Sequence, residues 1–158
     1  MKVELMDVFR MEYDFSWDTE TWFVPLETAL DGLKSSDASW QPPGGGNTIW
    51  QTVNHLNYYN DLLVSRINGT PPGKKEPNNK ATFGDTGNPE ESEKWNAVVE
   101  ETYLISEKLR KLLAEVNDSQ LEKEYVGGLA RHILHNVYHI GQIVLIRKQQ
   151  GSWPLERE

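Results

Sequence analysis

The chain has 158 residues, of which 37% are apolar, and it carries a formal net charge of -8 at pH 7. This length suits one domain around a single core, so we predict one domain over residues 1–158. The negative charge, without a cluster of Lys and Arg, argues against nucleic-acid binding, because such a surface repels phosphate backbones.

The sequence contains no stretch long and apolar enough to predict a membrane span or a signal peptide, so we expect no membrane partner. It also contains no cysteine. Disulfides, Cys-ligated metal sites and a cysteine nucleophile are therefore excluded. Together these features lead us to expect a cytoplasmic protein, since a reducing compartment suits such a chain.

Residues 2–34 have a helical pattern, but one straight helix is not expected. The segment 15–18, Phe-Ser-Trp-Asp, and Pro25 interrupt it, and proline breaks the hydrogen-bond pattern of a helix. We predict a bend or a break in this region. Residues 40–43, Trp-Gln-Pro-Pro, are predicted to form a loop.

A second helix is predicted after the three glycines at 44–46, with Asn47 or Thr48 as its N-cap. It is expected to run to Ile67 and to end at Asn68 and Gly69. Residues 69–87 are rich in Pro, Gly, Asn and Lys, which predicts a mobile loop.

Two further helices follow. Asn88 is the expected cap of the third, with Pro89 at the first helical position, and the apolar spacing continues to about Val116. The last helix is predicted to begin between residues 126 and 129 and to end at Gln150 and Gly151. No segment predicts a strand. Four helical regions joined by loops predict an all-α protein, an antiparallel four-helix bundle.

Three of the four histidines fall within the last helix, at His132, His135 and His139. At roughly 100° per residue they lie within about 60° of one another on one side of that helix. His135 and His139 are one turn apart, so both imidazoles can reach one metal ion. His55, at the edge of the apolar stripe of the second helix, is our candidate for the third ligand. Three imidazoles and a water are typical of an open, catalytic metal site.

A purely structural interpretation remains open at this point. An isolated His-x-x-x-His on a helix is a weak signal, and buried histidines often bond to carbonyl groups. Against this, all four histidines lie on two helices, and the helix with three of them is otherwise strongly apolar.

Two segments resemble motifs of the DinB/YfiT-like superfamily, which is distinct from the DNA polymerase that shares the name. Residues 135–143, His-Asn-Val-Tyr-His-Ile-Gly-Gln-Ile, resemble its closing motif. Residues 49–56, Ile-Trp-Gln-Thr-Val-Asn-His-Leu, resemble its second-helix histidine segment. The glycine-rich approach at 44–50 and the Gly-Ser-Trp-Pro exit at 151–154 are also similar.

The resemblance implies a four-helix bundle with a metal ion held by His55, His135 and His139. The ion is zinc or nickel in different members, and many members are homodimers. Two departures from the family pattern stand out. Many relatives carry an acid where Asn136 stands, and His132 is an extra histidine, which we interpret as a neighbour of the ligands rather than a ligand.

Several members of that superfamily are transferases or isomerases that use bacillithiol, mycothiol or glutathione. We therefore expect a metal-dependent transferase that joins a low-molecular-weight thiol of the bacillithiol type to an electrophilic small molecule. The thiol must arrive as a cosubstrate, because the chain has no cysteine. No residue is indicated as catalytic beyond the metal ligands.

Two other functions remain open: a hydrolase that uses a metal-bound water, and a non-catalytic metal-binding stress protein. The nearest acids by sequence, Asp61 and Glu124, share no evident face with the histidines. The sequence therefore offers no obvious general base, which favours the thiol over water as the nucleophile.

The last helix is apolar on nearly all sides, which predicts either a central position or cover by a second subunit. Leu134, Tyr138 and Leu145 lie roughly opposite the histidines. We expect a homodimer with this helix at or near the interface; complete burial within one chain is the alternative.

Overall fold

The computed structural model describes residues 3–157, with side chains except those of residues 123, 124 and 157. Residues 1, 2 and 158 of the predicted domain lie outside this part. Every regular element in the described part is helical, as predicted. The α-helices are α1 (Leu5–Trp17), α2 (Leu26–Leu30), α3 (Ser35–Ala38), α4 (Ile49–Asn68), α5 (Ser92–Glu115) and α6 (Lys123–Gln150), and the 3-10 turns are η1 (Lys80–Phe83), η2 (Asp118–Gln120) and η3 (Leu155–Arg157).

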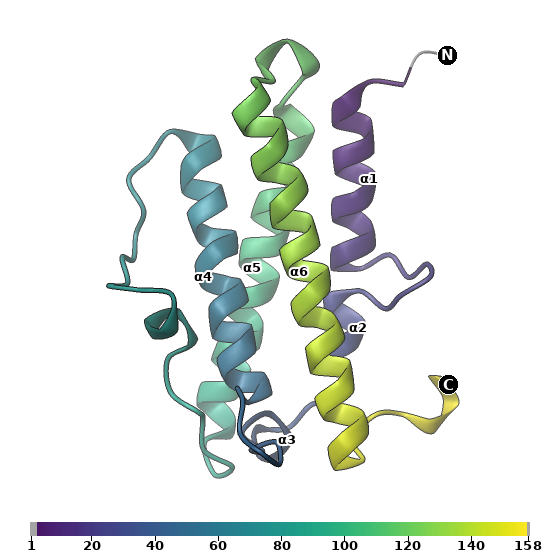
Figure 1. Cartoon of the computed structure of the whole chain (residues 1–158), viewed down its shortest axis with the longest axis vertical. Helices are drawn as coiled ribbons and strands as arrows, with labels where there is room; N and C mark the ends of the chain where they lie inside the picture. Colours follow the sequence, from purple (N-terminus) through teal and green to yellow (C-terminus); the bar gives the residue numbers. More distant parts are fainter. Residues whose placement is uncertain (1–2, 158) are drawn as a thin grey trace.

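The four long helices α1, α4, α5 and α6 lie side by side along the long axis of the molecule (Figure 1). Helices α4 and α5 run in the same direction. Trp50 packs on Trp95 near the start of each, with ring centroids 5.3 Å apart, and farther along Asn57 donates to the carbonyl of Val98. The expected antiparallel arrangement therefore fails for this pair, because residues 69–91 carry the chain back to the level at which α4 begins (Figure 1).

The boundaries of α4 agree with those predicted. The hydroxyl of Thr48 accepts the backbone N–H of Gln51 at 3.1 Å, and the Gln51 side chain accepts the N–H of Thr48, so the two residues form a capping box. Gly69 ends the helix with a φ of 66°, in the left-handed region that glycine enters without steric cost.

Other boundaries differ from the prediction. The interruption near Pro25 is confirmed, since α1 ends before it and α2 begins after it. Asn88 caps a turn rather than a helix, because its side chain accepts the N–H of Glu90 and α5 begins only at Ser92. Helix α6 begins at Lys123, before the expected residues, which places Gly127 and Gly128 inside it.

Residues 79–87, which we call the strap, belong to the predicted loop, contain the turn η1 and lie against α4. Three side chains, one from the N-cap of α4 and two from α4 itself, donate to strap carbonyls at distances of 2.8 to 3.2 Å: Thr48 to Thr86, Asn54 to Phe83, and Gln51 to Gly84. The strap therefore covers the part of α4 that carries His55.

Large buried side chains from all four long helices form one core. Burial of each contributes roughly 1.5–3 kcal/mol of transfer free energy. They include Met6, Tyr13, Ile49, Val53, Leu56, Trp95, Leu109, Leu113, Leu129, Ile140 and Ile143. Within the described part of the chain, no helix has the length and apolar character needed to cross a membrane.

Gly87 is a position at which the strap lies directly against a side chain of α4. Its φ is 83°, and a Cβ added there would lie within 3.0 Å of ring atoms of the buried Trp50. We expect Gly87→Ala to lower the free energy of unfolding by about 3 kcal/mol, through backbone strain and overpacking. Urea unfolding followed by circular dichroism measures this change.

Gly45→Ala is the matched control for Gly87→Ala. Gly45 also has a positive φ, 91°, but nothing lies within 4 Å of its added Cβ. Its replacement by Ala should lower the free energy of unfolding by about 1 kcal/mol, through backbone strain alone. Equal losses in the two variants would contradict the close contact between strap and helix.

Candidate functional site

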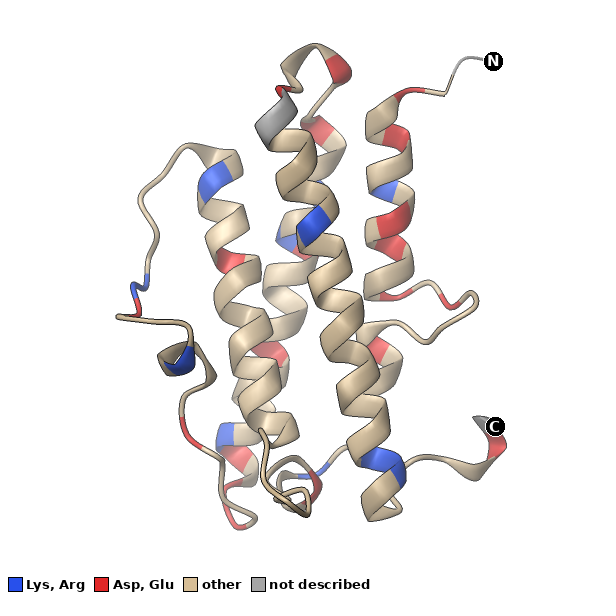
Figure 2. Cartoon of the chain, viewed as in Figure 1, with Lys and Arg blue, Asp and Glu red and all other residues tan. Residues whose placement is uncertain are grey.

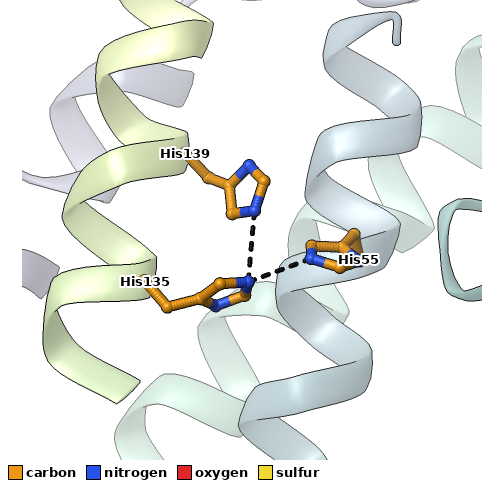
Figure 3. Close-up of side chains that lie close together, drawn as sticks. All are labelled: His55, His135 and His139. Atoms are coloured by element: carbon orange, nitrogen blue, oxygen red, sulfur yellow. Dashed lines mark hydrogen bonds between the residues drawn. The ribbon is translucent and has the colours of Figure 1, made fainter. Parts of the chain in front are cut away.

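The three histidines predicted as ligands come together between α4 and α6 (Figure 3). The Nε2 atom of His135 lies 3.0 Å from Nε2 of His55 and 3.1 Å from Nε2 of His139. One ring nitrogen from each residue lies within 4.8 Å of the other two. His55 and His139 are buried, and His135 is half-buried.

Helix geometry explains this convergence. His135 and His139 are four residues apart on α6, so their side chains emerge one above the other. The facing α4 presents His55 at the same level and Asn60 one turn or so farther along, where it meets His132. Two straight helices packed side by side are therefore sufficient to bring the three rings together.

Hydrogen bonds at the outer nitrogens set the orientation of two rings. The hydroxyl of Thr82 donates to the carbonyl of Asn79 at 2.6 Å, so its oxygen accepts the Nδ1–H of His55, also at 2.6 Å. The amide of Gln142 donates through Nε2 to Tyr138, so its Oε1 accepts the Nδ1–H of His139 at 2.7 Å. In both histidines Nε2 therefore carries a lone pair and no proton.

The centre of the cluster holds more lone pairs than protons. Of the three Nε2 atoms, only that of His135 can carry a proton. That N–H can donate a hydrogen bond to His55 or to His139, but not to both at once. A cation matches such a donor set. Four-coordinate zinc with Zn–N bonds of about 2.0–2.1 Å holds its nitrogens roughly 3.3 Å apart, near the 3.0 and 3.1 Å between these atoms. The residues present thus fit a metal ion.

His132 lies one turn from this centre and belongs to a second, buried polar cluster. Its Nε2 donates to Oδ1 of Asn60 at 2.6 Å, and Nδ2 of Asn136 donates to the same oxygen at 3.1 Å. His132 is therefore a neighbour of the three nitrogens, as interpreted from the sequence. An ionised acid in place of Asn136 could only accept hydrogen bonds, so this contact to Asn60 depends on the amide.

A pocket of about 640 Å³ opens above the three histidines. Aromatic side chains form much of its wall: Phe83 stacks on His55 with ring centroids 4.0 Å apart, and Tyr59 packs edge-on to the same ring. Tyr138 also lines the pocket, 5.1 Å from His139, so the expectation that it lies opposite the histidines is wrong.

No acidic residue lines this pocket among the described side chains. Asp61 lines a different pocket, together with Asn54 and Glu101. The side chain of Glu124 lies outside the described part of the structure. Accordingly, the described residues supply no carboxylate that acts as a general base at the histidines.

Sequence reasoning found the three imidazoles but missed the residues that orient them. The position of Gln142 could have indicated its role, because it lies three residues after His139 and therefore on the same side of the helix. No sequence feature identifies Thr82 and Phe83 in the same way, because nothing in a polar loop indicates which of its residues will contact a particular helix.

Burial lowers the pKa of each histidine in the site. The pKa of His55 falls to about 3, through burial first and then through His139 and His135. Burial and the neighbouring His139 lower the pKa of His135 to about 4. Burial also lowers the pKa of His139. Neutral imidazoles, the form that binds metal ions, are therefore favoured at pH 7.

One of the three comparisons with known proteins gives a match. A model of the DinB superfamily matches residues 24–145, which is more than half of the chain. The matched range contains all three converging histidines. No curated protein and no solved structure gives a significant match.

The lowered pKa values predict a loss of stability in weak acid for the protein treated with a chelator. Unfolded histidines bind protons near pH 6.5, whereas His55 binds one only near pH 3. Between these values the unfolded state holds more protons, so the free energy of unfolding should fall as the pH drops from 6.5 to 5. Urea unfolding at several pH values measures this, and the His55 Hε1 signal in NMR spectra should stay unchanged over the same range. A normal midpoint near 6.5 for His55 would contradict the prediction.

Proposed function

Because the chain belongs to the DinB superfamily, we propose that it is a divalent-metal-binding protein whose ligands are His55, His135 and His139, and that the long helices form this family's four-helix bundle. The observation that carries the proposal is the meeting of three Nε2 atoms, two of them without protons, at the base of an open pocket. Zinc and nickel both favour imidazole ligands of this kind.

We further propose that the protein is a transferase for a low-molecular-weight thiol of the bacillithiol type. The sulfur of the thiol forms a bond to an electrophilic carbon, the bond from that carbon to its leaving group breaks, and the thiol proton leaves with the departing group. A divalent ion, when bound, lowers the pKa of a coordinated thiol and so supplies the nucleophile at neutral pH.

The side chains of the pocket support this reaction over hydrolysis. Water as nucleophile has a second proton to lose, which calls for a base within reach, and the described lining residues include no carboxylate. A thiol loses its only proton before attack and needs no such base. Tyr59, Phe83 and Tyr138 supply an aromatic wall suited to an apolar electrophile.

The test combines metal analysis with turnover. We expect purified protein loaded with zinc or nickel to hold one ion per chain, and His135→Ala to lose it. With bacillithiol and monochlorobimane, the wild-type protein should form the fluorescent thioether, and His135→Ala should be slower by roughly 100-fold or more.

His132→Gln is the matched control, because it replaces a histidine one turn away with a side chain that can still donate to Asn60. It should keep the ion and most of the activity. Full metal occupancy in His135→Ala would refute the ligand set. Metal binding without turnover for any available thiol would refute the transferase and favour a non-catalytic metal-binding protein, whereas ester hydrolysis without thiol would favour a hydrolase.

We also propose that the protein is a homodimer. Leu134, Tyr138 and Leu145 on α6 are 68%, 64% and 56% exposed, which is unusual for large apolar side chains on one helix. A second copy that packs its own α6 on this face would bury them in both subunits. This interface would lie beside the pocket, since Tyr138 belongs to both.

Light scattering on the protein as it elutes from a size-exclusion column tests the proposed dimer. We expect a mass twice the 18.1 kDa of one chain at tens of micromolar. Leu134→Glu combined with Leu145→Glu should give the single-chain mass, because two buried charges oppose association. Leu104→Glu on α5, where Leu104 is 66% exposed, is the control and should leave the dimer intact. A wild-type monomer would refute the proposal.

A further inference from the structure

The pocket above the histidines has positive charge at its other end. Arg66 from α4 and Arg131 from α6 line it, together with Gly128, and no described acidic side chain does. The described lining of the pocket thus carries positive charge, although the whole chain has a net charge of -8. Arg66 is the only Lys or Arg in the sequence of α4, and Figure 2 shows blue on this helix near its C-terminal end.

Neither guanidinium group has a carboxylate partner among the described side chains. The ion pairs there involve two lysines and also Arg10 and Arg110, which bind acids on α1, at its C-cap and on α5. Arginine presents a planar set of five donors that matches a carboxylate in a two-point contact. The two pocket arginines thus have donors available for a ligand.

Two adjacent glycines in α6 make room for these groups. Gly127 and Gly128 lie inside the helix, where glycine is among the least favourable residues. A Cβ at Gly128 would lie 3.9 Å from a guanidinium nitrogen of Arg66, and one at Gly127 would lie 3.6 Å from those of Arg131. Longer side chains at these positions would fill the space that the guanidinium groups and this end of the pocket occupy.

The two ends of the pocket are close enough for one small molecule to reach both. Gly128 and His135 both line the pocket, and seven residues of helix correspond to about 10 Å along the axis. His132 lies between these ends, and its pKa is lowered by burial first, then by His135 and then by the charge of Arg66. One extended small molecule can therefore contact the arginines and the histidine cluster together.

We propose that Arg66 and Arg131 bind a carboxylate of the thiol cosubstrate and so make the protein selective for thiols that carry one about 10 Å from the sulfur. This inference deepens the transferase proposal and rests on it for the identity of the ligand. The arginines hold the anionic end, while the sulfur lies toward the three imidazoles. Thiols without a carboxylate lose the contact at the far end of the pocket.

Glutathione and its diethyl ester are matched probes, because esterification removes both carboxylates and leaves the thiol in place. Calorimetric titration of the zinc-loaded protein at low salt should show glutathione binding about tenfold more tightly than the ester or better, the advantage of a charged two-point contact. The variant Arg66→Gln/Arg131→Gln should lose this advantage and keep one zinc per chain.

Lys108→Gln/Lys111→Gln on α5 is the control for net charge, since it also removes two positive charges from exposed positions outside the pocket. It should keep the preference for glutathione. Equal affinities for the two probes in the wild-type protein, or a preference that persists in the double arginine variant, would overturn the proposal.

S-methylglutathione separates this inference from the metal and its chemistry. Its sulfur cannot form a thiolate. If the protein binds S-methylglutathione more tightly than the diethyl ester of that compound, the difference therefore depends on the arginines. We expect that preference in the wild-type protein and in His135→Ala, whether or not metal is bound. Its loss in His135→Ala alone would refute an anion site that is independent of the metal, whereas its presence in a protein without transferase activity would refute only the reaction.

Discussion

Two hydrogen bonds determine what this site can do, and both lie on the outer side of the imidazole rings. Thr82 accepts the Nδ1 proton of His55, and Gln142 accepts that of His139, so each ring turns an unprotonated Nε2 inward. With the opposite tautomers, the same three rings at the same distances would direct protons at one another. The affinity of the cluster for a cation therefore depends on two neutral side chains outside it as much as on the histidines.

These hydrogen bonds come from different kinds of structure. Gln142 is carried by the same helix as its histidine, and the regular spacing of that helix brings the two together. Thr82 belongs to the strap, which α4 holds through bonds to strap carbonyls and through the close contact between Gly87 and Trp50. The parallel course of α4 and α5 makes this possible, because the connection between them must run the whole length of α4.

The helices and the pair His135 and His139 could be predicted because both follow from local rules, whereas His55 was joined to the pair as the one histidine outside the last helix and through the family resemblance. Caps such as Thr48 and Gly69 fix helix ends, and residues four apart on α6 must share a side. The direction of α5 could not be predicted, since the composition of residues 69–91 does not reveal the path of a long connection. For the same reason Thr82 and Phe83, which orient and cover His55, were not identified. The arginines were missed because an exposed arginine on a helix is usually just solvated.

The strap has one further consequence, for how this protein can diverge. Thr82 sets the tautomer of His55, and the next residue, Phe83, forms the stacked wall of the pocket. Insertions or deletions in a surface connection are ordinarily tolerated, but a shift of one residue here would exchange a hydroxyl for a benzyl group at the imidazole. The shape of this wall and the orientation of the imidazole are therefore coupled, so a change in the wall that keeps the tautomer of His55 is a substitution in place rather than a change in the length of the strap.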